Sequence, residues 1–161
     1  MRQVPAKYLI IGRGRLASHL ANYFQLLKIP FQVWTRAQSQ NELKKLVESA
    51  ERILLAIKDD AIESFIVQNG LPAAKTIHFS GTLSTPLATR LHPLMTFSKE
   101  MYSLDEYVKI PFGGEEGQPQ LKILMPELDK AGVSIRKNVQ GLCHARRVLS
   151  GKRTVVLWEA M

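Results

Sequence analysis

The sequence predicts an α/β fold of the doubly wound type, in which helices cover both faces of a mostly parallel sheet. Two observations carry this expectation. Short apolar segments alternate with segments whose apolar residues recur every three or four positions, and the first apolar segment ends in a glycine-rich turn. Such alternation implies parallel strands joined by right-handed crossovers. With 161 residues, the chain has about the size of one ordinary domain with a single core.

The glycine-rich turn follows a strand expected over residues 7–11. Residues 12–17 read Gly-Arg-Gly-Arg-Leu-Ala, which is the Gly-x-Gly-x-x-Ala pattern of dinucleotide-binding turns. In this pattern Gly12 allows the tight turn, Gly14 lets the backbone approach a pyrophosphate, and Ala17 lets the next helix pack closely on the strand. The N–H groups at the start of that helix then face the phosphates. The turn therefore predicts a Rossmann-type fold that binds a dinucleotide.

The second strand indicates which dinucleotide is bound. Apolar residues recur at helical intervals over 17–27, Pro30 closes this helix, and a strand is expected over 31–34. Thr35 and Arg36 end the strand, about 20 residues after the glycines, where the residue that reads the ribose is expected. An acidic residue there would bind the ribose of NAD, whereas an arginine suits the extra phosphate of NADP. Arg36 therefore favours NADP over NAD, and the alternative is a surface arginine.

Strand and helix continue to alternate after this point. A buried strand is expected over 52–57, and Asp59 or Asp60 can cap the helix that follows. The next strand is expected over 76–79 and breaks at Ser80. The carboxyl ends of these strands should converge on one edge of the sheet, where ligands of such folds bind. The residues expected to contact the cofactor are Gly12, Arg13, Gly14, Arg15, Leu16, Ala17, Thr35, Arg36, Ala56, Ile57, Lys58, Asp59, Ser80 and Gly81.

The second half of the chain has weaker patterns. A strand is expected over 108–112, a helix over 121–128 and another strand over 133–135. Residues 86–103 form the one long irregular segment, and irregular loops at this edge often carry function.

Four segments, taken in order, resemble a known family. Residues 57–62 read Ile-Lys-Asp-Asp-Ala-Ile, 78–84 read His-Phe-Ser-Gly-Thr-Leu-Ser, 91–97 read Leu-His-Pro-Leu-Met-Thr-Phe, and 110–117 read Ile-Pro-Phe-Gly-Gly-Glu-Glu-Gly. Together they resemble the Rossmann-like N-terminal domain of a family of NADP-dependent oxidoreductases, which joins this domain to a C-terminal helical domain of unknown function. Pyrroline-carboxylate reductases, ketopantoate reductases and deazaflavin-dependent NADP reductases are more distantly similar. The resemblance implies hydride transfer between the nicotinamide of NADP and a small carbonyl or imine substrate.

The resemblance also suggests a domain division. Residues 1–138 would form the Rossmann domain, and residues 139–161 a C-terminal helix that begins the helical domain. The family usually has an aromatic residue where this chain has Cys143, and Asn-Phe where it has Lys152 and Arg153. The segment either docks against a second copy, giving a homodimer, or is a truncated or altered tail.

Two histidines are candidates for catalysis. His92 follows the strand end at Ser80, which should lie near the nicotinamide, and its imidazole could donate a proton to a substrate carbonyl. The alternative is a structural loop histidine. His144 is the second candidate, because related reductases build their substrate site where the two domains meet; its alternative is an interface residue. His19 and His78 are expected to be packing or surface residues, and the single cysteine and four histidines lack the spacing of metal ligands.

Composition limits the classes of partner. The net charge is +8, but residues 136–161 hold six basic residues against one acidic residue. Stacking aromatics or a recognisable binding module usually accompany a nucleic-acid site, and neither is present. No apolar run is long enough to cross a bilayer, and the single cysteine fits a reducing cytoplasm. A non-catalytic module that binds NADP or another nucleotide, as a sensor or scaffold, remains the alternative to an enzyme.

Overall fold

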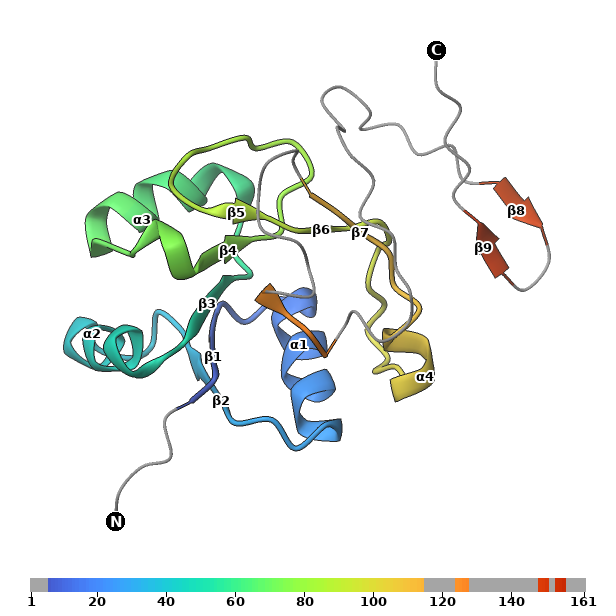
Figure 1. The fold of residues 1–161 in the computed structure, drawn as a ribbon, viewed down its shortest axis with the longest axis horizontal. Coiled ribbons are helices and arrows are strands. Elements are labelled where there is room, and N and C mark those ends of the chain that lie inside the picture. The colour runs from blue at the N-terminus through green and yellow to red at the C-terminus, as the bar shows by residue number, and fades with distance from the viewer. Residues whose placement is uncertain (1–5, 115–123, 128–147, 151–152, 156–161) are drawn as a thin grey trace.

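The computed structural model describes residues 6–114 and 124–127, together with the backbone of residues 148–150 and 153–155. Its centre is a five-stranded sheet in which every neighbouring pair of strands is parallel (Figure 1). The strand order is β2-β1-β3-β4-β5, so the first strand lies between the second and the third. This parallel order confirms the predicted α/β fold of the doubly wound type. The strands are β1 (Tyr8–Ile11), β2 (Phe31–Trp34), β3 (Arg52–Leu55), β4 (Thr76–His78) and β5 (Thr89–Arg90).

Helices cover both faces of this sheet. Helix α1 (Arg15–Leu26) packs on one face, and α2 (Gln40–Ser49) and α3 (Ile62–Asn69) pack on the other (Figure 1). Successive residues of β1 point to opposite faces: Tyr8 and Ile10 join the core beside α1, and Leu9 and Ile11 join the core beside α2 and α3. Burial on both faces explains why β1 is apolar throughout and fully buried.

Local signals define the helix ends. Ser39 caps α2, because its side-chain oxygen accepts the backbone N–H of Glu42. Gly70 ends α3 in a left-handed conformation with φ of 59°, which suits glycine. Short 3₁₀ turns, η1 (Asp59–Ala61) and η2 (Ala73–Lys75), precede α3 and β4.

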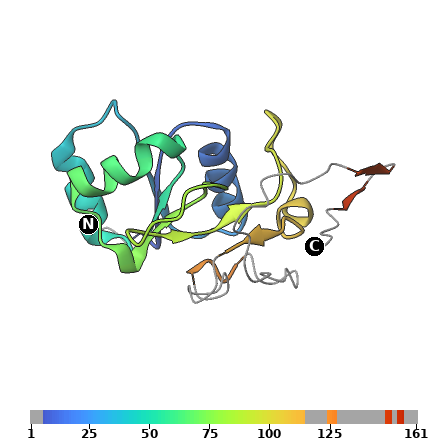
Figure 2. The same ribbon diagram turned by 90° about the horizontal axis from the view of Figure 1, so that it is seen from above.

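After β5 the chain leaves the parallel sheet. Strand β6 (His92–Pro93) pairs with β7 (Phe112–Gly113) in an antiparallel ribbon, and α4 (Leu104–Tyr107) packs against α1. Figure 2 shows α4 and β7 beyond α1, on the side away from α2 and α3. The strand predicted over 108–112 is wrong over most of its length. Ser103 and Glu106 form a capping box that starts α4, and extended pairing begins only at Phe112.

The predicted C-terminal elements lie largely outside the described residues. Of the helix expected over 121–128 only residues 124–127 are described, and the strand expected over 133–135 is not among them. Within the predicted helix 139–161, the structure describes two short antiparallel strands, β8 (Val148–Ser150) and β9 (Arg153–Val155), so these residues are extended rather than helical. Their β-branched residues favour extended backbone. The domain division after residue 138 remains a prediction.

Candidate functional site

The turn after β1 is held between the ends of the two neighbouring strands. The Gly12 N–H donates to the Trp34 carbonyl at 3.0 Å, and the Ala56 N–H donates to the Ile11 carbonyl at 2.9 Å. Gly12 has φ of 139°, a conformation that side chains rarely adopt, and a Cβ on it would lie 2.3 Å from the Ala56 oxygen. Glycine is therefore required at this position by the fold itself, before any ligand is considered.

Two residues later, Gly14 faces open space. It is the N-cap of α1 with φ of −78°, and no heavy atom of the described structure would lie within 4 Å of a Cβ added to it. No side chain caps α1, and its first turn holds no acidic residue. Helix α2 differs on both points, because Ser39 caps it and Glu42 lies in its first turn.

The start of α1 therefore has the properties of an anion site. Its first N–H groups lack a side-chain acceptor, and the helix dipole adds positive potential there. Arg13 and Arg15 are both exposed beside it. A phosphate group would satisfy the N–H groups and the charge together.

The end of β2 lies next to this turn. Trp34 pairs with Ile11, the residue before Gly12, so Thr35 and Arg36 extend from the same edge of the sheet. The Thr35 N–H donates to Oε1 of Gln38 at 2.8 Å, which holds this segment in a tight turn. Arg36 is exposed, and its guanidinium makes no hydrogen bond or ion pair with the residues that the structure describes.

The ends of β3 and β4 are joined by two side chains. Ser80 is buried, and its hydroxyl donates to Oδ2 of Asp59 at 2.5 Å. The same Ser80 oxygen accepts the backbone N–H groups of Thr82 at 3.2 Å and Leu83 at 3.0 Å. The expectation that Asp59 or Asp60 caps the following helix is wrong: neither η1 nor α3 has a side-chain cap, and the Asp59 carboxylate is bonded to Ser80.

His92 lies against the same turn. Its Nδ1 is 3.0 Å from the Phe79 carbonyl oxygen, which can only accept, so Nδ1 carries a proton. A Cβ on Gly81 would be 2.9 Å from both Cε1 and Nε2 of the His92 ring, so the ring packs directly on the Gly81 backbone. Within the described residues Nε2 has no hydrogen-bond partner, and His92 is half-buried. Nε2 is thus the ring nitrogen available to a ligand.

The glycine turn, the end of β2 and the ends of β3 and β4 lie at one edge of the sheet, as expected from the parallel strand order. Arg13, Arg15, Arg36 and Lys58 are exposed there, whereas Ala17 is buried beneath the turn. Leu16, Ala56 and Ile57 are half-buried against the two cores. His144 lies outside the described residues.

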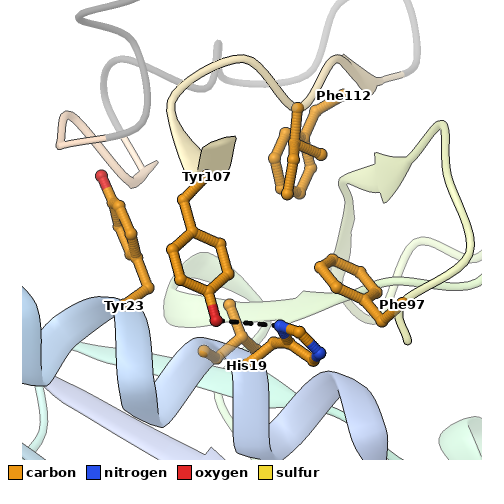
Figure 3. A pocket seen from close by; sticks show the side chains of 7 residues that line it. His19, Tyr23, Phe97, Tyr107 and Phe112 are labelled. Carbon is orange, nitrogen blue, oxygen red and sulfur yellow. Dashed lines mark hydrogen bonds between the residues drawn. The ribbon is translucent and has the colours of Figure 1, made fainter. Parts of the chain in front are cut away.

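Sequence reasoning missed the polar and aromatic cluster around His19. This residue is buried; its Nε2–H donates to the Ser98 carbonyl at 3.1 Å, and its Nδ1 accepts from the Tyr107 hydroxyl at 2.8 Å (Figure 3). Phe97 and Tyr102 contact the His19 ring, and Arg15 donates to the Phe97 carbonyl at 3.3 Å. The cluster therefore holds the segment after β6 against the first half of α1. The recurrence of aromatics at positions 97, 102 and 107 was the available sequence signal.

The cavity inside this cluster is small. Its volume is about 10 Å³, which is room for no more than one water molecule. Its walls are mostly apolar and aromatic (Figure 3). The cluster therefore packs the protein and does not form a substrate site, which agrees with the packing role expected for His19. The residues that line the cavity are His19, Leu20, Tyr23, Phe97, Tyr107, Ile110 and Phe112.

The described part of the chain shows neither a metal-binding cluster nor a membrane-spanning helix. No three histidine, cysteine, aspartate or glutamate side chains lie together there in a group that could hold a metal ion. Among the helices described, none combines the length and the apolar character needed to cross a membrane.

Comparison with known proteins gives a likeness in fold. No protein-family model and no curated protein matches this chain. Among solved structures, an imine reductase from Aspergillus terreus in complex with NADPH4 and a dibenzazepine aligns with a TM-score of 0.55 at 18% identity, over 84% of this chain and 56% of that one. A reductive aminase from Aspergillus terreus in complex with NADPH4, cyclohexanone and allyl amine aligns with a TM-score of 0.51 at 18% identity, over 78% of this chain and 53% of that one.

A further structure of the reductive aminase, in complex with NADPH and ethyl-5-oxohexanoate, aligns with a TM-score of 0.55 at 16% identity, over 84% of this chain and 55% of that one. The likeness independently supports the Rossmann-like fold. This chain spans a little over half the length of these proteins.

Proposed function

We propose that this chain is the NADP(H)-binding domain of an oxidoreductase that transfers hydride between the nicotinamide and a small carbonyl or imine substrate. The observation that carries the proposal is the start of α1, where the first N–H groups have no side-chain cap, the space beside Gly14 is open, and Arg13 and Arg15 are exposed. The fold likeness supports it, because the imine reductase and the reductive aminase were crystallised with NADPH or NADPH4.

The residues at the sheet edge fit the parts of NADP in order. The N–H groups of α1, with Arg13 and Arg15, would bind the pyrophosphate. Arg36 is exposed without a partner in the described structure, and its planar guanidinium suits the 2′-phosphate. The backbone of residues 56–58, which follows β3, would line the path from the pyrophosphate toward the nicotinamide. When bound, NADPH supplies the hydride.

His92 would supply the proton that hydride transfer requires. A hydride added to a carbonyl or imine carbon leaves negative charge on the oxygen or nitrogen, which a proton must neutralise. Because Nδ1–H is held by the Phe79 carbonyl, the proton of the charged imidazole that can be given away is the one on Nε2. His144 is retained as the second proposed catalytic residue.

The cofactor is tested by thermal unfolding of the purified chain. We expect NADPH to raise the melting temperature more than NADH does, because only NADPH carries the phosphate that Arg36 can bind. Arg36→Asp should abolish or reverse this difference. Lys28→Asp is the matched control, since it makes the same charge change at the exposed end of α1 on the opposite edge of the sheet. Equal stabilisation by NADPH and NADH in the wild type would contradict the NADP assignment.

Catalysis is tested separately from binding. We expect cyclohexanone together with allyl amine to accelerate oxidation of NADPH, and His92→Asn to slow it by about 100-fold or more. Tight NADPH binding without turnover over a panel of small carbonyl and imine compounds would favour the second candidate function, a nucleotide-binding sensor or scaffold.

We also propose a homodimer formed through residues 139–161 and a location in the cytoplasm. The apolar residues Val155, Val156, Leu157 and Trp158 support association, and the single cysteine supports a reducing compartment. Light scattering of the full chain and of Leu157→Asp tests the first proposal. A wild-type monomer at micromolar concentration would contradict it.

A further inference from the structure

We infer that Asp59 is a positioning residue that fixes the orientation of the His92 imidazole through the turn at Ser80. This inference rests on the proposed function in so far as His92 is assigned the role of proton donor. The sequence predicts that Asp59 contacts the cofactor; here its role is instead to support the turn at the end of β4. The contacts among His92, the turn at Ser80 and Asp59 carry the inference.

The His92 ring is fixed by the turn at Ser80 rather than by its own strand. Its Nδ1–H donates to the carbonyl of Phe79, and its ring lies against the backbone of Gly81. These two residues flank Ser80 on either side. Any displacement of the turn at Ser80 therefore moves both surfaces that define the plane and the tautomer of the His92 ring.

The Ser80 hydroxyl holds this turn together. A hydroxyl has one proton to donate and two lone pairs to accept with. Ser80 uses all three, because it accepts the N–H groups of Thr82 and Leu83 and donates to Asp59. It is only 3% exposed, so water cannot substitute for a lost partner. With its capacity used up inside the protein, Ser80 is not available to bind a substrate.

Asp59 anchors this turn to the end of the adjacent strand. Asp59 begins η1, four residues after the last residue of β3, and β3 pairs directly with β4. The ionised carboxylate can only accept, so it fixes the direction of the Ser80 proton and leaves the Ser80 lone pairs facing the two N–H groups. Thr82 adds a weaker hydroxyl contact to the same Oδ2 at 3.5 Å. A hydrogen bond to a charged group is stronger than a neutral one, which suits Asp59 to this task.

The test measures the His92 tautomer in the chain without cofactor, because nitrogen NMR distinguishes a protonated ring nitrogen from an unprotonated one. Spectra are recorded at a pH where the nitrogen shifts themselves show a neutral ring, and His92→Gln identifies the signals. In the wild type we expect the proton on Nδ1. In Asp59→Ala the ratio of the Nδ1–H form to the Nε2–H form should fall by about tenfold, the change expected for loss of one ordinary hydrogen bond.

Three variants make the result specific. Asp59→Asn keeps an oxygen that can accept from Ser80 and should retain most of the wild-type preference. Asp60→Ala, at the exposed neighbouring carboxylate of η1, should leave the ratio unchanged. Ser80→Ala removes the other partner of the same hydrogen bond and should reproduce the effect of Asp59→Ala, and it supplies the measurement if Asp59→Ala does not fold.

A folded Asp59→Ala or Ser80→Ala variant with the wild-type tautomer ratio would overturn the inference. Absence of NADPH binding or turnover is a different result. It would count against the proposed function and would leave the dependence of the His92 tautomer on Asp59 as measured.

Discussion

The carbonyl oxygen of Ala56 lies so close to Gly12 that a Cβ atom at Gly12 would be 2.3 Å from it. This contact joins the ends of β1 and β3, and the hydrogen bond from the Ala56 N–H to the Ile11 carbonyl lies beside it. The backbone at the end of β3 therefore occupies the volume that a side chain on Gly12 would need. The first glycine of the turn serves the packing of the sheet, whereas the second, Gly14, faces open space.

Gly12→Ala is therefore expected to destabilise the fold. The residue has φ of 139°, and the methyl group would meet backbone atoms that cannot rotate away. Strain at such a backbone conformation together with the steric clash should lower the free energy of unfolding by about 3 kcal/mol or more. Urea unfolding followed by circular dichroism measures this change. A loss below about 1 kcal/mol would show that the end of β3 can move aside.

Gly14→Ala is expected to separate stability from binding. Alanine is compatible with φ of −78°, and a Cβ there meets no described atom within 4 Å, so the free energy of unfolding should change by less than about 1 kcal/mol. The methyl group would occupy the space through which a pyrophosphate approaches α1. Most of the rise in melting temperature caused by NADPH should then disappear. Stabilisation by NADPH equal to that of the wild type would place the phosphates elsewhere.

The features that could be predicted from the sequence are those with local signals. The apolar strands and the glycine turn each depend on a few adjacent residues, and both were found where expected. The convergence of the strand ends followed from the parallel topology alone. The Ser103 and Glu106 capping box is also a local signal, but the apolar residues after it favour a strand, so the sequence pattern does not predict α4.

The contacts that define the candidate site could not be predicted, because they join residues far apart in the chain. Ser80 and Asp59 are separated by 21 residues and meet only because β3 and β4 are neighbours. His19 and Tyr107 are separated by 88 residues and meet because α4 packs on α1. A pattern within either segment gives the type of element, but the partner of a buried polar group depends on how the elements are arranged.

Tyr107→Phe is expected to loosen the segment after β6 from α1. The Tyr107 hydroxyl donates to Nδ1 of His19 at 2.8 Å and accepts from Nδ2 of Asn22 at 3.0 Å. Removing it leaves the buried Nδ1 of His19 without its donor while the ring packing is kept, which should cost about 1–3 kcal/mol. Urea unfolding measures the loss. Tyr102→Phe is the matched control, because it removes a different hydroxyl in the same aromatic cluster. The Tyr102 hydroxyl accepts from the Ser98 N–H at 3.0 Å and does not contact His19 Nδ1 through a hydrogen bond. A free energy of unfolding equal to that of the wild type would show that the His19 contact contributes nothing.

Glu127 is bound by two side chains at the start of β1. Lys7 forms an ion pair with its Oε1, and the Tyr8 hydroxyl donates to its Oε2 at 2.8 Å. Burial alone would raise the pKa of Glu127, but the hydrogen bonds from Lys7 and Tyr8 outweigh it and hold the pKa below its ordinary value. Burial is the larger cause that raises the pKa of Tyr8, and the hydrogen bond to the Glu127 carboxylate is the second. The Tyr8 hydroxyl therefore remains a donor in neutral solution.

Because the pKa of Glu127 is lowered in the folded state, the contribution of Glu127 to stability depends on pH. A carboxyl group that is more acidic in the folded state stabilises the fold fully above its unfolded pKa of about 4.3, and this contribution is lost as the pH falls through the folded pKa. Glu127→Gln should therefore lower the free energy of unfolding above about pH 5, and the difference from the wild type should shrink below about pH 4. Urea unfolding of both proteins, at a series of pH values from above about 5 to below about 4, measures the difference in the free energy of unfolding. Glu63→Gln, at an exposed carboxylate on α3, controls for the loss of one negative charge. Hydrogen bonds from Ser103 also lower the pKa of Glu106, but Glu106 is present in both proteins, so its effect cancels in the difference. A difference that stays constant or grows toward low pH would show that the contacts with Lys7 and Tyr8 do not favour the ionised carboxylate.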